Sequence, residues 1–352
     1  MTEESPLDGG REQRAPEFRR RLALLRSLLE RQGDAAALLS SRVNFAWLTA
    51  GGTGHVLQSA QAAIVSLLVT RDDVVAVAQN IEAARLLDEE LDGLDIELAP
   101  VPWWEQGALE AEVRRRLDTN RHVLRDVDLE PDLVAARSVL TDHDRARMAL
   151  LGRTARTAMD AASAAARAGM SENDLAADLL GRLPGTRVPV LLAAADARIA
   201  TYRHPLPGDA RMRSRVMLVM VAERWGLHVA LTRIREFEPP SADLLRRTES
   251  VRSVQAAMHD ATRPGATLGA VLDAGRAAYA AAGYPDEWRD HHQGGTIGYQ
   301  ARERIAIVDD PTVIDPDMAF AWNPSIAGAK AEDTLVLAGG AQRVVTDAGD
   351  GP

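Results

Sequence analysis

The chain has 352 residues, of which 46% are hydrophobic and 26% charged, and it contains no cysteine. These values are typical of globular proteins, and this length predicts two domains, since one domain usually has about 100 to 200 residues. A net charge of -10 argues against a nucleic-acid partner, because phosphate backbones attract basic surfaces. The lack of cysteine excludes disulfides, thiolate metal sites and cysteine nucleophiles.

The first sixteen residues, MTEESPLDGGREQRAP, have neither the basic start nor the apolar stretch of a signal peptide. No later segment approaches the roughly 18 uninterrupted apolar residues that a membrane-spanning helix needs. We therefore expect a cytoplasmic protein with no membrane partner. Residues 1–16 are also too polar to bury much surface, and we predict that they form a flexible arm.

Residues 17–137 have the pattern of a small α/β domain. Leucines at helical spacing between Phe18 and Gln32 predict an amphipathic helix. The segments AAALLS, AAIVSLLV and DVVAVA have the length and composition of buried strands, and IEAARLLDEELDG has the pattern of a helix. This alternation of strands and helices predicts a largely buried sheet.

Residues 138–352 have the pattern of an α+β domain. A long helix is predicted from about Thr141 to Gly169, and another begins at Ser171. Strands around VPVLLAA, VMLVMVA and HVALTRI follow, and two further helices are expected between residues 241 and 282. We predict helices packed on a curved antiparallel sheet.

Several strings, in this order along the chain, are similar to the family of creatinase, prolidase and aminopeptidase P. NFAWLT, residues 44–49, stands where that family has a strand, while GMSENDLAADL and RPGATLGAVLDAGRAAYAAAGY resemble two of its helices. HHQGG, WNPS and EDT follow. The resemblance implies an α/β amino-terminal domain that helps to form a homodimer. It also implies a carboxy-terminal α+β domain of the pita-bread fold, with the active site in its cleft.

Peptidases of this family hold two divalent metal ions with two Asp, one His and two Glu side chains. The resemblance places Val219 and Ala230 at the two Asp positions and His292 at the His position. It places Asn323 and Glu332 at the two Glu positions. Because Val and Ala have no lone pair to donate and Asn carries no charge, we predict no dinuclear site, no metal ion and no other cofactor.

On this resemblance three residues are the catalytic candidates. His204 matches a substrate-facing histidine of the family, and His292 is free to exchange protons when no metal is bound. Imidazoles with an ordinary pKa of about 6.5 can act as acids or bases near neutral pH. Glu332 is the retained carboxylate, either a general base or a partner for a cation. The competing interpretation of His204 is a loop histidine packed beside Pro205. That of His292 is a histidine hydrogen-bonded within the sheet, and that of Glu332 is a carboxylate paired with an Arg such as Arg233.

Six further side chains are assigned to substrate binding. The glycines of HHQGG let the backbone approach a ligand closely. Arg302 can bind a carboxylate through two parallel hydrogen bonds, although a surface Arg–Glu pair is the competing interpretation. Lys330 is the only lysine of the chain. The predicted substrate-binding residues are His291, Tyr299, Arg302, Asn323, Lys330 and Arg233.

The leading hypothesis is a metal-independent enzyme that acts on a small-molecule substrate by His and Glu acid–base catalysis. Creatinase, in the same family, works without metal, so hydrolysis of a C–N bond is the nearest analogue. Elimination, isomerisation and cyclisation are related possibilities. The second hypothesis is a non-catalytic binding or scaffold protein, as in histone-chaperone domains that resemble this family. The third is an ordinary Xaa-Pro metallopeptidase.

Overall fold

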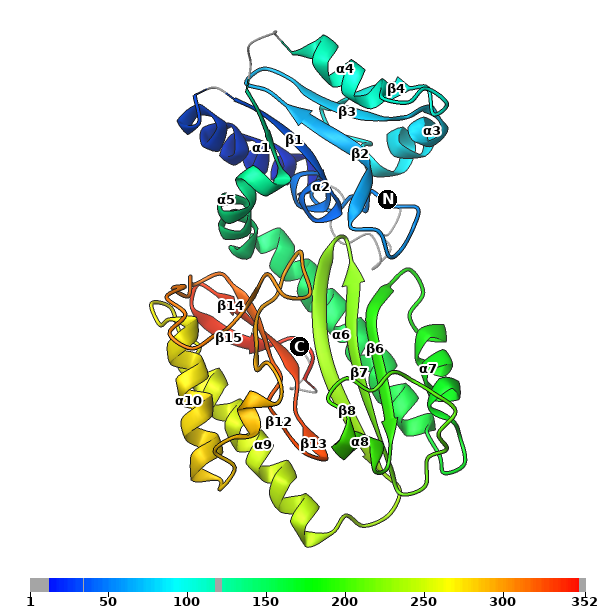
Figure 1. The fold of residues 1–352 in the computed structure, drawn as a ribbon, viewed down its shortest axis with the longest axis vertical. Coiled ribbons are helices and arrows are strands. Elements are labelled where there is room, and N and C mark those ends of the chain that lie inside the picture. The colour runs from blue at the N-terminus through cyan, green and yellow to red at the C-terminus, as the bar shows by residue number, and fades with distance from the viewer. Residues whose placement is uncertain (1–12, 34, 118–121, 348–352) are drawn as a thin grey trace, which may run out of the picture. The chain divides into compact units, whose positions relative to one another are not determined.

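The computed structural model describes residues 13–33, 35–117 and 122–347. The chain divides into two compact units, residues 1–137 and residues 138–352 (Figure 1). In the described ranges, no helix combines the length and the apolar character that crossing a bilayer requires.

A five-stranded sheet forms the centre of the amino-terminal unit. Its strand order is β4-β3-β2-β1-β5, and the β3–β4 and β1–β5 pairs are parallel while the other two pairs are antiparallel. The strands are β1 (Ala36–Ser41), β2 (Ala62–Val69), β3 (Val74–Gln79), β4 (Glu97–Val101) and β5 (Val123–Arg125). The helices are α1 (Arg14–Arg31), α2 (Arg42–Leu48), α3 (Ala83–Arg85), α4 (Ala108–Arg116) and α5 (Asp126–Ser138).

Two segments of this unit differ from the sequence-based prediction. Residues 1–12 of the predicted arm lie outside the described residues. The end of the arm differs from the prediction, because α1 already begins at Arg14. The buried Arg14 side chain donates to the Thr49 carbonyl at 2.9 Å. The predicted strand NFAWLT is wrong, because these residues lie in and directly after α2. The Ser41 hydroxyl caps this helix by accepting the Asn44 N–H at 3.3 Å.

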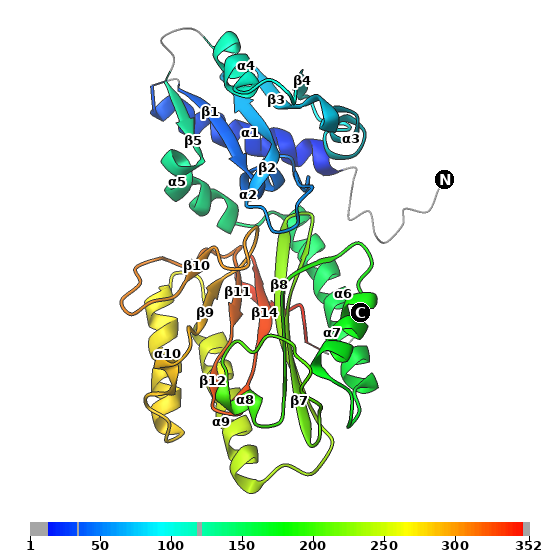
Figure 2. The ribbon, with the colours of Figure 1, turned by 45° about the vertical axis from the view of Figure 1, so that its right-hand side comes forward.

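Two antiparallel sheets and a hairpin form the carboxy-terminal unit, with strand orders β6-β7-β8, β10-β9-β11-β14-β15 and β12-β13 (Figure 2). The first two are joined where the Thr232 N–H donates to the Glu332 carbonyl at 3.0 Å. The longer strands are β6 (Arg187–Ala195), β7 (Arg215–Arg224), β8 (Leu227–Glu236), β11 (Ala319–Trp322), β14 (Asp333–Ala338) and β15 (Ala341–Val344). The shorter ones are β9 (Gly294–Thr296), β10 (Arg304–Ile305), β12 (Ser325–Ile326) and β13 (Ala329–Lys330).

Helices cover these sheets on opposite sides. Figure 1 shows α6 and α7 beside the β6-β7-β8 sheet, and α9 and α10 beside the other strands. Thr141 starts α6 with a capping box, in which its hydroxyl accepts the Asp144 N–H and the Asp144 carboxylate accepts the Thr141 N–H. The helices are α6 (Asp142–Ala165), α7 (Glu172–Gly181), α8 (Arg198–Thr201), α9 (Ala242–Ala261) and α10 (Leu268–Ala281).

Candidate active site around three histidines

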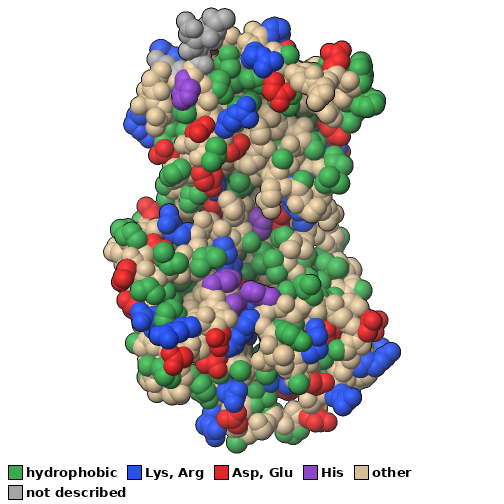
Figure 3. Space-filling view, viewed as in Figure 1, with side chains coloured by type: hydrophobic (Ala, Val, Ile, Leu, Met, Phe, Trp, Pro, Cys, Tyr) green, Lys and Arg blue, Asp and Glu red, His purple; other side chains and the backbone are tan. Residues whose placement is uncertain are grey.

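Three histidines from two separate loops meet in the carboxy-terminal unit. His204 follows α8, and His291 and His292 precede β9. One ring nitrogen from each lies within 4.8 Å of the other two, and the Nε2 atoms of His204 and His291 are 3.2 Å apart. Figure 3 shows histidine side chains gathered on a face of this unit beside Lys and Arg side chains. We call these three residues the histidine cluster.

The histidine cluster is electrically neutral near pH 7. Burial, with a further contribution from Lys330, lowers the pKa of His291 to about 3. Burial and then the charge of Arg302 lower the pKa of His292 to about 4. The pKa of His204 is also lowered, by burial and then by Lys330. Each ring therefore keeps one nitrogen lone pair that can accept a proton or bind an ion.

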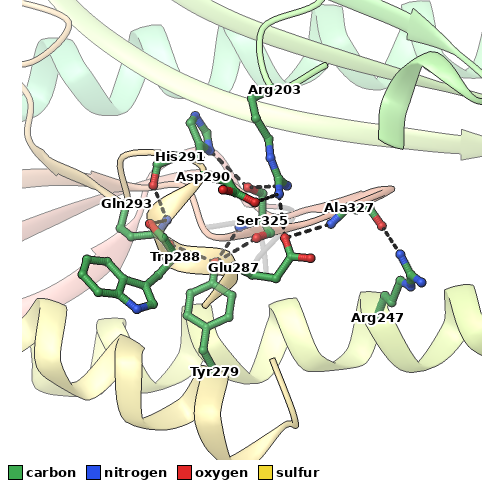
Figure 4. Close-up of polar contacts among 10 residues, drawn as sticks. All are labelled: Arg203, Arg247, Tyr279, Glu287, Trp288, Asp290, His291, Gln293, Ser325 and Ala327. Atoms are coloured by element: carbon green, nitrogen blue, oxygen red, sulfur yellow. Dashed lines mark hydrogen bonds and ion pairs between the residues drawn. The ribbon is translucent and has the colours of Figure 1, made fainter. Parts of the chain in front are cut away.

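A second group of side chains fixes His291. Its Nδ1 lies 3.1 Å from the Ser325 hydroxyl, and the Arg203 guanidinium donates to the same hydroxyl at 3.3 Å. The Ser325 N–H in turn donates to the Tyr279 hydroxyl at 2.7 Å (Figure 4). Arg203 is held by Glu287 at 2.6 Å. The orientation of the His291 ring is therefore set by contacts on the side away from His204.

The Glu332 carboxylate is buried and fully engaged. Lys330 Nζ and Arg302 Nη2 each lie 2.9 Å from one of its oxygens, and the Thr232 hydroxyl donates to it at 2.9 Å. Burial opposes its ionisation, but the two cations outweigh burial and lower the pKa of Glu332 to about 2. At neutral pH it is an anion that holds two cations of the chain itself, so this geometry favours the competing interpretation, a carboxylate paired with an Arg, and the catalytic role of Glu332 stays a prediction.

Asn323 lies beside the segment that carries the histidines. Its N–H donates to the Gln293 carbonyl at 3.1 Å, and its side chain is buried. Among the described residues, the Asn323 Oδ1 atom has no hydrogen-bond partner. A buried carbonyl without a partner costs about 1 to 3 kcal/mol. This oxygen is therefore a candidate acceptor for a donor group on a substrate, which agrees with the predicted role of Asn323.

Two predicted substrate-binding residues make other contacts. The Tyr299 hydroxyl is buried and donates to Asp144 at 2.6 Å, which ties its loop to α6. Arg233 lies 3.1 Å from Asp333 and donates to the Thr346 carbonyl at 2.6 Å. Arg302, by contrast, pairs with Glu332, and this Arg–Glu pair is buried rather than at the surface. These partners of Tyr299 and Arg233 are not members of the histidine cluster, and the substrate-binding roles of both residues stay predictions.

The residues at the family's metal-ligand positions do not fit a pair of metal ions. Val219 packs among apolar side chains that include Met217, and Ala230 bonds through its backbone N–H and carbonyl to the Thr334 hydroxyl. Neither side chain has a lone pair. Asn323 is a neutral amide, and both oxygens of Glu332 are already occupied by partners within this unit. Two hard divalent cations would lack the bridging carboxylates that they require.

A small pocket opens beside the histidine cluster. Its lining includes Tyr202, Arg203, Met217, His291 and Lys330, and it has room for about one water molecule. Sequence reasoning assigned no role to Arg203 or Ser325. Arg203 directly precedes His204, and Ser325 follows Asn323 by two residues, so closeness in the sequence to those candidates was the available signal.

Comparison with family models matches residues 146–340 to the metallopeptidase family M24. The structure is similar to the dipeptidase PepE from Mycobacterium ulcerans, with a TM-score of 0.75, 18% identity, and coverage of 95% of this chain and 96% of the other. The prolidase from Thermococcus sibiricus gives a TM-score of 0.76 and 17% identity, with coverage of 94% and 97%.

A third similar structure is the N-terminal domain of the FACT complex subunit SPT16 from Cicer arietinum. It has a TM-score of 0.70 and 12% identity, and covers 96% of this chain and 97% of the other. Comparison with curated proteins gives no match. The similar structures confirm the predicted fold, an α/β amino-terminal domain followed by a pita-bread domain. Because the family model spans more than half of the sequence, this chain belongs to the metallopeptidase family M24.

Proposed function

We propose that the chain is a hydrolase that cleaves a C–N bond of a small molecule without the paired metal ions of dinuclear family members. One observation carries this proposal. Where the family's ligand positions hold Val219, Ala230 and Asn323, three neutral histidines converge beside a buried carboxylate. Activation of the attacking water therefore falls to the histidine cluster.

Substrate binding in this proposal uses the charged groups around the cluster. Lys330 and Arg302 together carry two positive charges against the single negative charge of Glu332. One positive charge is therefore left over, which favours a substrate that carries a carboxylate or another anionic group. The unpartnered Asn323 Oδ1 adds an acceptor for an N–H donor of the same molecule. An N-acylated or amidino-substituted acid has both features.

A panel of small molecules tests this proposal. The full-length chain is incubated with N-acyl amino acids, guanidino acids and dipeptides with and without Pro, and released amine or ammonia is quantified by mass spectrometry. We expect turnover of at least one N-acyl or guanidino acid. Acid–base groups contribute about 100- to 10,000-fold to rate, so His204→Asn and His292→Asn should each lower turnover at least about 100-fold.

His122→Asn is the matched control, because His122 is an exposed histidine of the amino-terminal unit. It should leave turnover unchanged. Turnover that survives both His204→Asn and His292→Asn would contradict the proposed role of the cluster.

A second candidate function is a non-catalytic binding protein, which the likeness to a FACT complex subunit favours. A third is an ordinary Xaa-Pro metallopeptidase, which the likeness to the prolidase from Thermococcus sibiricus favours. Turnover limited to Xaa-Pro dipeptides and dependent on two bound ions would support the third candidate. The homodimer and the cytoplasmic location stay predictions from the sequence.

A further inference from the structure

We infer that His204, His291 and His292 together form a binding site for one borderline transition-metal ion, such as Zn²⁺ or Co²⁺. This site shares only the His292 position with the family's dinuclear centre, since it uses three imidazoles and no carboxylate. A catalytic role for this ion rests on the proposed function. Binding of the ion can be tested without any substrate.

Two of the three ring separations in the histidine cluster match such a site. Tetrahedral zinc with Zn–N bonds of about 2.0 to 2.1 Å separates its ligand nitrogens by about 3.3 Å and the centres of its imidazole rings by about 5.2 Å. The Nε2 atoms of His204 and His291 are 3.2 Å apart. The three ring-centre separations are 5.0, 6.0 and 4.9 Å. Closing the widest separation, between His204 and His292, requires a movement of one of these side chains, and His204 is exposed.

The surroundings of His291 favour ligation. In metal sites the second ring nitrogen of a ligating histidine usually donates to a fixed acceptor, which points the other nitrogen at the ion. His291 has this arrangement, because its Nδ1 lies 3.1 Å from the Ser325 hydroxyl and its Nε2 faces His204. Ser325 is itself held by Arg203 and Tyr279. His292 must give up one long contact, in which its Nδ1 accepts the Gly294 N–H at 3.3 Å.

Charge and ligand type select the class of ion. Imidazole suits zinc, cobalt, nickel and copper, whereas magnesium, calcium and manganese prefer carboxylate oxygens. The nearby carboxylate, Glu332, is occupied by Lys330 and Arg302, so it is not offered as a ligand. An ion held by three neutral imidazoles with an open position supplies Lewis acidity to a substrate or water.

The test uses the untagged full-length chain, stripped with a chelator and titrated with Zn²⁺ by calorimetry and with Co²⁺ by visible absorption. We expect one Zn²⁺ per chain and a Co²⁺ spectrum of four- or five-coordinate geometry. His204→Asn and His291→Asn should each weaken binding at least about 10-fold, and His122→Asn should leave it unchanged. Ser325→Ala should weaken binding about 10- to 100-fold, as loss of a supporting hydrogen bond does in other metal sites. Thermal unfolding of each variant verifies that it is folded.

Three results would overturn the inference: no saturable binding, two ions per chain, or binding that His204→Asn and His291→Asn both leave intact. These results also separate the inference from the proposed function. If no metal ion binds but hydrolysis still depends on the histidine cluster, only the inferred metal site is contradicted and the proposed function stands. Two ions per chain would contradict both.

Discussion

Two buried glutamates, one in each unit, form hydrogen bonds and ion pairs with similar types of side chain, but the groups that surround these contacts differ. In the amino-terminal unit Glu90 binds Arg85 and the Thr53 hydroxyl, both at 2.8 Å, and accepts the Thr53 N–H at 2.6 Å. In the carboxy-terminal unit Glu332 binds Arg302, Lys330 and the Thr232 hydroxyl. In both cases burial opposes ionisation, but the partners outweigh burial and lower the pKa of the carboxyl group. For Glu90 the Thr53 N–H contributes most, and for Glu332 the charges of Lys330 and Arg302 do.

The surroundings decide which of the two belongs to a site. Glu90 ties a loop to a helical turn and also receives a backbone N–H, a typical structural arrangement. The charge of Lys330 acts on the pKa of Glu332 and of all three histidines. Asn323, another residue at a ligand position of the family, has an unpartnered oxygen among the described residues. A buried, charge-paired carboxylate is thus no functional signal by itself. Unsatisfied or convergent groups beside it are the better indicator.

The largest effect on stability is expected when the Glu332 carboxylate is removed. Glu332→Ala leaves Lys330 and Arg302 without their buried partner, and breaking a buried ion pair costs about 3 to 5 kcal/mol. Urea denaturation should show this decrease in the free energy of unfolding. Glu332→Ala combined with Lys330→Met should recover part of it, and an equal loss in the single and double variants would contradict the pairing.

Removal of Glu90 should cost less. Its partner Arg85 keeps about a third of its side chain exposed and also lies near Glu82 and Glu89. We therefore expect Glu90→Gln to lower the free energy of unfolding by about 1 to 3 kcal/mol, the cost of unpaired hydrogen-bonding groups. The same variant should leave Zn²⁺ affinity and turnover unchanged. A change in either would mean that Glu90 is more than structural.

Acid should destabilise the chain partly through Glu332. Its pKa in the folded chain, about 2, lies below the ordinary value of 4.5. Its contribution to stability is therefore complete above pH 4.5 and is lost as the pH falls toward 2. Glu332→Gln should be less stable than the wild type at pH 7, and this difference should shrink as the pH falls from 4.5 toward 2. Chemical denaturation at several pH values measures it, and a constant difference would contradict the low pKa.

The smallest effect on stability is expected at Asn323. Since Asn323 Oδ1 has no partner among the described residues, Asn323→Leu removes a buried polar group without breaking a hydrogen bond to that oxygen. Such a replacement is nearly neutral or stabilising. Thermal unfolding should therefore change little, while substrate affinity falls. A large loss of stability would show that Asn323 is structural, like Glu90.

Much of the fold and part of the candidate site could be predicted from the sequence, and the remaining features could not, for physical reasons. The long strands and helices of the carboxy-terminal unit follow from their apolar period. The proposal that no dinuclear site forms rests on residue type, because Val219 and Ala230 have no side-chain atom that can ligate a metal. Glu332 does pair with an Arg, as the competing interpretation expected, but this Arg is Arg302 and not Arg233, the example named from the sequence. Successive strand residues point to opposite faces, and Arg233 meets Asp333 instead.

The composition of the histidine cluster was only partly predictable. His204 and His292 were identified through the resemblance, but their approach to His291 and the support by Ser325 depend on loops 87 and 34 residues apart in sequence. Neither periodicity nor spacing encodes such contacts. The strand assigned to NFAWLT failed for a related reason, since a single capping hydroxyl, that of Ser41, starts a short helix there.

The most direct test compares Zn²⁺ stoichiometry in two variants, Glu332→Gln and His291→Asn. In a dinuclear centre of the family type, Glu332 would be a ligand and His291 would not. We predict that Glu332→Gln still binds one Zn²⁺ per chain and that His291→Asn binds it at least about 10-fold more weakly. Two ions in the wild type, lost in Glu332→Gln and retained in His291→Asn, would contradict the histidine cluster as the active centre.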